Sequence, residues 1–148
     1  MSVDMSCSYV EVSVKNADVK RLVKLAINDP ELGPIVKYRL KTKAVLLFVD
    51  DKVVGLSIPR KDVVGRYRTG PIYVLPEERQ KGYAKAFVSA YFKDRKGRAY
   101  IAVSNLASQA LFKSCGFYKS GKKTKPKDEL FEEWLYDPKP PLSQTWEG

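Results

Sequence analysis

The spacing of hydrophobic and polar positions changes repeatedly along the chain and predicts alternating strands and helices. Polar and apolar side chains alternate over residues 8–14, as in a strand with one buried face. Apolar residues then recur at positions 19, 22, 23 and 26, which predicts a helix with Asp18 as its N-cap. Two short apolar runs, residues 44–49 and 53–58, flank Asp50-Asp51-Lys52, a pattern typical of a hairpin of buried strands.

The second half of the chain continues the alternation. A strand over residues 72–75 is closed by Pro76, and an apolar stripe predicts a helix from residue 77 to about 94, ended by Gly97. A strand over residues 99–103 follows, then a helix capped by Asn105 that runs to about residue 115, and strands from residue 117 and over 130–136. This order predicts one domain over residues 1–148, a mixed, largely antiparallel α/β sheet with helices on both faces, and a polar tail from about residue 138.

Composition narrows the class of protein. The chain has 148 residues, the size of one compact domain, and its longest apolar run is six residues, 44–49, which is too short to span a bilayer. Residues 1–9 do not resemble a secretory signal, and two cysteines are too few for a disulfide scaffold. We therefore expect a cytoplasmic protein without a membrane partner and without a metal site.

The charged and titratable residues constrain the chemistry. There is no histidine, which excludes Ser-His-Asp and Cys-His catalysis. The 27 Lys and Arg residues exceed the 17 Asp and Glu residues, so the net charge is +10 and an anionic partner is expected, although a solvated basic surface would give the same count. Basic residues gather in residues 38–43, 60–68, 93–98 and 119–127, where the pattern indicates loops or element ends.

The junction after the strand over residues 72–75 suggests a phosphate-binding site. The helix expected there carries Arg79, Lys81, Gly82 and Ala84 in its first turn. N–H groups in the first turn of a helix lack internal partners and attract anions, and small residues let a diphosphate approach the backbone. Neither a Walker loop nor a dinucleotide-binding Gly-x-Gly-x-x-Gly motif is present.

A longer pattern at this junction resembles a known family. Residues 74–84 fit Val-x-Pro-x-x-Arg-x-x-Gly-x-Ala and resemble the acyl-CoA-binding motif of the GNAT superfamily of N-acyltransferases. A second block, with Asn105, Ser108, Phe112 and Gly116-Phe117, is similar to the family's strand, Asn-x-x-Ala/Ser, Leu-Tyr and Gly-Phe pattern. Positions 105, 108 and 112 share one helix face, which would line the cofactor.

The resemblance implies a reaction and a set of contacts. The central strands would splay apart, the pantetheine arm of acetyl-CoA would pair with the strand that contains Val74 and Leu75, and the acyl carbonyl would lie near Val74. The diphosphate would bind the backbone amides of residues 80–84, and an amine would attack the thioester directly. The implied cofactor-binding residues are Val74, Leu75, Arg79, Gln80, Lys81, Gly82, Tyr83, Ala84, Asn105 and Phe112.

The sequence departs from the family at the proton donor. The family usually has a tyrosine where this chain has Phe112, and phenylalanine has no proton to give to the leaving thiolate. Ser108, one helical turn earlier, is the first candidate to replace it, followed by Tyr118 and Cys115. The alternative interpretation makes Ser108 an ordinary small helix residue and Cys115 a buried apolar one.

The acceptor remains open at the level of sequence. The basic groups at residues 38–43 and 119–127 would frame the acceptor groove in such a fold, which favours an acidic or nucleic-acid-associated amine. Tyr38, Tyr67 and Tyr118 lie in or beside basic segments and could stack on bases. Modification of a DNA base, as in phage enzymes of the Mom type, is one alternative, and an acyl-CoA-binding protein with attenuated catalysis is another. A monomer and a homodimer are both compatible with the sequence.

Overall fold

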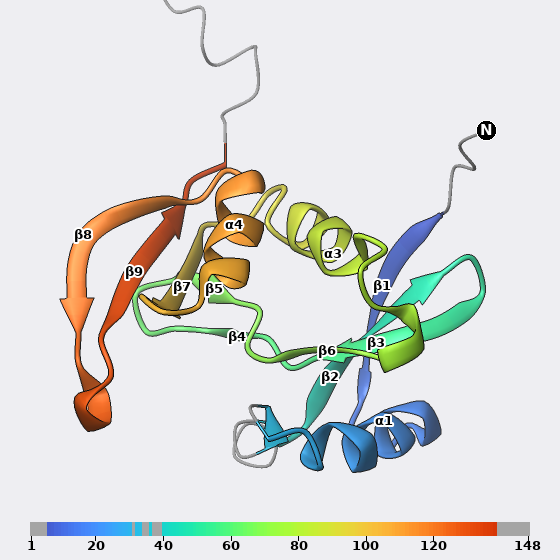
Figure 1. Ribbon diagram of the computed structural model, residues 1–148. Coiled ribbons are helices and arrows are strands. Elements are labelled where there is room, and N and C mark those ends of the chain that lie inside the picture. The colour runs from blue at the N-terminus through green and yellow to red at the C-terminus, as the bar shows by residue number, and fades with distance from the viewer. Residues whose placement is uncertain (1–5, 31, 34–35, 37–39, 139–148) are drawn as a thin grey trace, which may run out of the picture.

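Strands and helices alternate along the chain in the computed structural model, which describes residues 6–30, 32–33, 36 and 40–138 (Figure 1). The strands are β1 (Cys7–Ser13), β2 (Lys43–Val49), β3 (Lys52–Ser57), β4 (Arg60–Lys61), β5 (Tyr67–Arg68), β6 (Ile72–Val74), β7 (Gly97–Ala102), β8 (Tyr118–Thr124) and β9 (Phe131–Tyr136). The helices are α1 (Ala17–Ile27), α3 (Tyr83–Tyr91) and α4 (Leu106–Ser114), with 3-10 turns η1 (Pro76–Glu78) and η2 (Pro126–Asp128).

The strands form two sheets rather than one. The first has the order β1-β2-β3-β6 and the second the order β4-β5-β7-β9-β8. All pairings are antiparallel except that of β5 with β7, which meet at Tyr67 and Gly97. The expected mixed, largely antiparallel sheet between helices is confirmed, and the splay appears as a break between β6 and β7.

The chain crosses from one sheet to the other within three residues. Strand β5 belongs to the second sheet and β6 to the first, so residues 69–71 bridge the break. Gly70 has φ of +64°, and a Cβ there would lie 2.1 Å from the carbonyl oxygen of Ile58, so only glycine fits without strain. The buried Ser57 hydroxyl donates to the carbonyl of Thr69 at 2.6 Å and fixes the bend.

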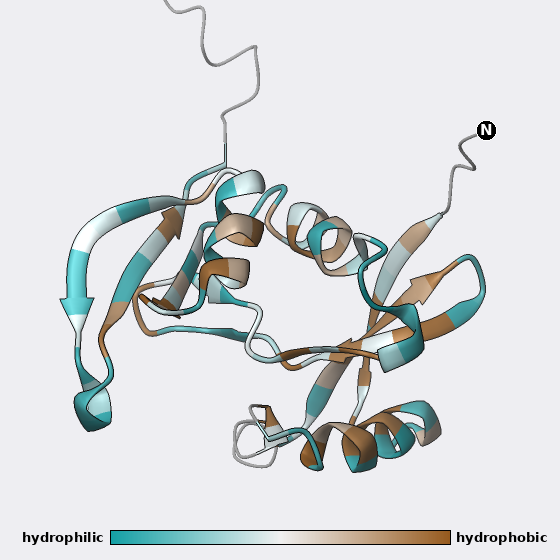
Figure 2. Ribbon diagram, in the orientation of Figure 1, coloured by the Kyte–Doolittle hydropathy of each residue, from teal (hydrophilic) through white to brown (hydrophobic). Residues whose placement is uncertain are grey.

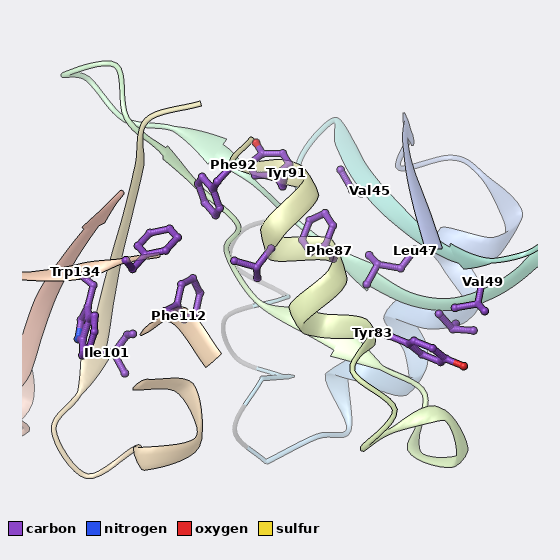
Figure 3. Packing of buried hydrophobic residues seen from close by; sticks show 13 residues of the cluster. Val45, Leu47, Val49, Tyr83, Phe87, Tyr91, Phe92, Ile101, Phe112 and Trp134 are labelled. Carbon is purple, nitrogen blue, oxygen red and sulfur yellow. The ribbon is translucent and has the colours of Figure 1, made fainter. Parts of the chain in front are cut away.

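Strand β2 is buried on both faces, which explains the unbroken apolar run 44–49. Val45, Leu47 and Val49 face α3, where they meet Tyr83 and Phe87 (Figure 3). The alternate residues contact the opposite cluster, which α1 covers through Val19, Leu22, Val23 and Ala26. Helices α1 and α3 lie on opposite faces of the first sheet (Figure 1). Because β2 contributes side chains to both clusters, the packing of both helices depends on the register of this one strand.

Two helix starts differ from the sequence predictions. The N-cap of α1 is Asn16, not Asp18: the Asn16 side chain accepts hydrogen bonds from the N–H groups of Asp18 and Val19. An amide oxygen two residues earlier in the chain therefore fills the cap, and Asp18 lies in the first turn. Helix α3 begins at Tyr83 instead of residue 77, because Pro76 starts a 3-10 turn and Arg79 then takes an extended conformation.

Further differences concern short elements and ends. Gly97 does not end α3 but begins β7, since the helix stops at Tyr91 with Phe92 as its C-cap. The two-residue strands β4 and β5 are too short to give a hydrophobic period and were not predicted. Most of the tail expected from residue 138 lies outside the described residues.

The role of β2 leads to a stability prediction. Leu46 is 2% exposed and belongs to the cluster under α1, so Leu46→Ala should lower the free energy of unfolding by about 2–5 kcal/mol. Val63→Ala, at a fully exposed loop position, is the control and should leave stability unchanged. Urea unfolding followed by circular dichroism measures both variants, and equal stabilities would contradict the assigned core.

Candidate active site

A cleft of about 370 Å³ lies at the break between the two sheets. Strands β6 and β7 border it, α4 forms one wall, and the bend before β6 lies at its base. Leu32, Arg68, Tyr100 and Phe131 also border it. The lining residues are Leu32, Arg68, Thr69, Gly70, Pro71, Ile72, Ala84, Arg98, Ala99, Tyr100, Ile101, Ala102, Asn105, Ser108, Leu111, Phe112 and Phe131.

In the part of the chain that the structure describes, one edge of β6 has no strand partner. The N–H of Leu75 donates to Val54 at 2.9 Å, and Tyr73 pairs with Leu56, so these residues turn their backbone groups toward β3. Because the direction alternates along a strand, Ile72 and Val74 turn theirs toward the break. Ile72 lines the cleft, whereas the carbonyl of Val74 accepts a hydrogen bond from Arg79 Nε at 2.8 Å. An extended ligand could therefore pair with β6 at Ile72.

The loop between β6 and α3 is braced by one buried carboxylate. Glu78 is 5% exposed and bonds to Lys52 and to Lys81, the latter at 3.2 Å. Hydrogen bonds from Lys52 and Lys81 hold the pKa of Glu78 below its usual value. Lys81 is thus engaged in an ion pair.

Arg79 is also held in place. Besides the bond to Val74, its guanidinium lies over the Tyr73 ring at 5.4 Å and 3.9 Å from a carboxylate oxygen of Asp29. These contacts connect the loop to β6 and to the residues after α1. Arg79 therefore shapes the loop that precedes α3 rather than moving freely above it.

The start of α3 forms a small cradle of backbone N–H groups. Gln80 and Gly82 both have positive φ, +64° and +83°, so the chain turns sharply before the helix. Gly82 is the N-cap, and no side chain caps the helix there. The first bond between turns runs from the Ala86 N–H to the Gly82 carbonyl, which leaves the N–H of Ala84 outside the helical pattern. Ala84 lines the cleft, so the positive end of the α3 dipole faces it.

Helix α4 supplies the opposite wall. Asn105 caps it by accepting a hydrogen bond from the Ser108 N–H at 3.1 Å, and both residues line the cleft together with Leu111 and Phe112. Phe112 is 8% exposed, and its ring meets the ring of Phe117 at 5.0 Å in a T-shaped contact. The predicted common face of residues 105, 108 and 112 is thus confirmed as a wall of the cleft.

The far side of the cleft carries a polar row that the sequence did not reveal. The Arg68 guanidinium lies 5.3 Å from the centre of the Tyr100 ring, and the Tyr100 hydroxyl donates to Glu133 at 3.1 Å. Glu133 is 5% exposed and also accepts a hydrogen bond from Ser120 at 2.7 Å. No sequence pattern joins these strands, although a glutamate directly before Trp134 in a predicted strand was a signal.

Glu133 stays ionised despite its burial. Burial alone would raise its pKa, but hydrogen bonds from Ser120 and Tyr100 and the nearby Arg98 charge hold the pKa below its usual value. Arg98 lies 3.0 Å from Glu133 and 2.6 Å from Asp62, so it joins two carboxylates. The row is a fixed polar wall with charges paired across strands.

Several predicted site residues lie elsewhere. Tyr118 is 48% exposed on β8, donates to Asp137 at 2.6 Å, and is not among the residues that line the cleft. Cys115 contacts Ser89 and the Lys85 carbonyl and does not line it either. Leu75 and Tyr83 are buried in the core, so only their backbone could serve a ligand. Of the two catalytic candidates, the structure brings only Ser108 to the cleft.

Comparison with known proteins identifies the family of this chain. The family model described as "Acetyltransferase (GNAT) family" matches residues 17–117, and the chain belongs to this family. It is therefore an acyltransferase of the acyl-CoA-dependent kind that acts on nitrogen. No curated protein sequence matches the chain.

Solved structures share the fold. A GNAT acetyltransferase from Bacillus cereus ATCC 10987 is 17% identical, with TM-score 0.72 over 91% of this chain and 99% of its own. An acetyltransferase from Bacillus subtilis, solved in complex with CoA, is 15% identical, with TM-score 0.63 over 90% and 99%. The NatC complex bound to Gag peptide and CoA contains a chain that is 17% identical, with TM-score 0.59 over 88% and 98%.

Two further features bear on the expected partners. Among the described residues, no group of three or more Cys, Asp or Glu side chains could hold a metal ion. No helix in the described part of the chain combines the length and hydrophobicity needed to cross a bilayer.

The bracing of the loop by Glu78 predicts a pH-dependent stability difference. Because the folded pKa of Glu78 lies below its ordinary value of 4.5, ionised Glu78 stabilises the fold above that pH, and the contribution is lost as pH falls through the folded pKa. Glu78→Gln should therefore be less stable than the wild type at pH 7, and the gap should close in acid. Thermal unfolding from pH 7 to pH 3 tests this, and a gap that widens in acid would contradict it.

Proposed function

We propose that this protein transfers an acetyl group from acetyl-CoA directly to the amine of an acidic or nucleic-acid-associated acceptor. The observation that carries the proposal is the single cleft that joins the unpaired edge of β6, the start of α3 and Ser108 on α4. A diphosphate at Gln80–Ala84 and a pantetheine arm along β6 fit those groups. An amine could then enter from the side of Arg68 and Tyr100.

The position of the bend favours a revised site for the thioester. The acyl carbonyl was expected near Val74, but Val74 is bonded to Arg79 and does not line the cleft. Pro71 has no N–H, so Ile72 is the first residue after the bend whose N–H can reach a carbonyl oxygen at the open edge. We therefore assign the thioester carbonyl to Ile72, where the N–H would stabilise negative charge on the oxygen.

The transfer needs one bond exchange and one proton movement. The amine nitrogen attacks the carbonyl carbon, the carbon–sulfur bond breaks, and one proton passes in net from nitrogen to the CoA sulfur. Phe112 offers no proton, whereas the Ser108 hydroxyl lies one helical turn away on the same wall. We therefore assign Ser108 as the proton donor to the CoA thiolate. The Ser108 hydroxyl regains a proton that the amine nitrogen releases through solvent.

This assignment predicts the behaviour of two substitutions. Ser108→Ala should lower kcat about 100-fold with little change in KM for acetyl-CoA, because a general acid is lost while the binding groups remain. Phe112→Tyr adds a phenol to the cleft wall and should restore much of the activity in the Ser108→Ala background. Release of free thiol with a panel of amine acceptors measures the rates, and mass spectrometry identifies the product.

Matched controls separate chemistry from binding. Calorimetry should give the same acetyl-CoA affinity for the wild type and both variants. Wild-type turnover in Ser108→Ala would contradict the role of Ser108, and absence of acetyl-CoA binding at millimolar ligand would contradict the proposed function itself. Acetyl-CoA binding without turnover on any acceptor would favour the alternative of a binding protein with attenuated catalysis.

The charge of β8 supports an anionic acceptor. Every residue of this strand is exposed, and Figure 2 shows it as a hydrophilic edge of the second sheet. Lys119 pairs with Glu132 at 3.5 Å, while Lys122 lies near the buried Glu133. The strand and the turn after it present Lys119, Lys122, Lys123, Lys125 and Lys127.

DNA modification is the second candidate, because an exposed strand of lysines suits a phosphate backbone. Tyr67 and Tyr118, proposed for base stacking, are less favourable for an acceptor in the cleft, because neither of them lines it and Tyr118 is bonded to Asp137. Tyr38 lies outside the described residues. The observations thus favour contact with phosphates or carboxylates over insertion of a base between these rings.

Charge reversal on the hairpin formed by β8, the turn after it and β9 tests both acceptor classes. Lys122→Glu, Lys123→Glu and Lys125→Glu together should raise KM for an acidic acceptor at least tenfold and leave KM for acetyl-CoA unchanged. Reversal of Lys15, Lys20 and Lys24, which are exposed in and before α1, is the matched control. A steep salt dependence of DNA binding that the hairpin variant abolishes would support DNA, and equal effects of both variants would refute a specific groove.

A further inference from the structure

A second hollow, of about 470 Å³, lies on the face of the molecule that carries α3 and shares no lining residue with the cleft. We name it the rear pocket and define it by Glu11, Lys41, Thr42, Lys43, Ile58, Pro59, Arg60, Lys61, Tyr67 and Tyr91. These residues come from β1, the start of β2, the β3–β4 connection, β5 and α3. Its volume lies within the usual range of ligand pockets, roughly 300–1,000 Å³.

The rim of the rear pocket is strongly cationic. Four of its residues are basic, Lys41, Lys43, Arg60 and Lys61, and its one acid, Glu11, pairs with Lys43 at 3.4 Å. Within the described part of the chain, neither Lys41 nor Arg60 has a carboxylate partner. Asp62, two residues after Arg60, is directed elsewhere by Arg98 and by the N–H groups of Val64 and Arg66. The rim therefore carries a net charge of three that nothing described there balances.

The floor is apolar and aromatic, and its rings are fixed. Ile58 and Tyr91 are buried, and the rings of Tyr67 and Tyr91 meet at 6.3 Å. The Arg95 guanidinium lies over both rings, at 5.5 Å and 4.5 Å, and donates to the Tyr9 hydroxyl at 2.9 Å. Burial raises the pKa of Tyr91 to about 12, so this phenol stays neutral at physiological pH.

A cationic rim above an apolar floor fits a ligand that has both anionic groups and a flat apolar body. We propose that the rear pocket binds a nucleoside phosphate, with the phosphates at Lys41, Arg60 and Lys61 and the nucleoside against Ile58 and Tyr67. This site is separate from the acetyl-CoA cleft, although the two meet at β5. Tyr67 faces the rear pocket, and the next residue, Arg68, faces the cleft.

The test is calorimetric titration of ATP into protein already saturated with acetyl-CoA, which keeps adenine nucleotides out of the cleft. ATP should still bind, and Arg60→Gln with Lys61→Gln should weaken it at least tenfold without changing acetyl-CoA affinity. Lys20→Gln with Lys24→Gln on α1 removes the same charge elsewhere and should have no effect. Inorganic tripolyphosphate and adenosine should each bind more weakly than ATP, because each lacks one half of the ligand.

Three results would overturn the proposal. ATP binding that disappears when acetyl-CoA is present would place all nucleotide binding in the cleft. Equal losses in the two double variants would indicate non-specific attraction to a basic surface. Tripolyphosphate that binds as tightly as ATP would remove the role of the floor. Failure of acetyl-CoA itself to bind would instead refute the proposed transfer reaction, and ATP titration of the two double variants would still test the rear pocket.

Discussion

The transfer of the chain from one sheet to the other at residues 69–71 is the constraint on which the site depends. Strand β5 is bound to β7 and strand β6 to β3, so the two sheets must diverge where the chain passes between them. Gly70 permits the turn, and the Ser57 hydroxyl holds it. Among the described residues, the divergence leaves an edge of β6 without a strand partner, and that edge is where the thioester is proposed to add to the sheet.

The fold separates the basic residues of the chain into those that are paired with carboxylates and those that are not. Part of the positive charge is neutralised inside the fold, where Arg98 joins Asp62 and Glu133 and where Lys52 and Lys81 enclose Glu78. Another part lies on β8 and its turn and around the rear pocket, and further exposed lysines lie in and before α1. Net charge alone could not separate these groups, because pairing depends on which strands become neighbours.

Elements with a clear hydrophobic period were predictable, and elements set by backbone geometry were not. The double burial of β2 and the shared face of Asn105, Ser108 and Phe112 follow from residue spacing. The late start of α3 does not, since it results from the Pro76 turn and the positive φ of Gln80. The polar row of Arg68, Tyr100 and Glu133 was equally hidden, because strand pairing alone brings these positions together.

The absence of histidine fits what the cleft offers. Glu133 is kept ionised by its donors and Tyr100 is bonded to it, so the far wall presents fixed dipoles rather than a group poised to exchange protons near pH 7. Alignment of amine and thioester can itself contribute many orders of magnitude to the rate. A direct transfer needs only one proton to reach sulfur, which is the role proposed for the Ser108 hydroxyl on α4. The proposed chemistry of this cleft therefore depends on how the amine and the thioester are aligned, and the break between the two sheets creates the space in which they can align.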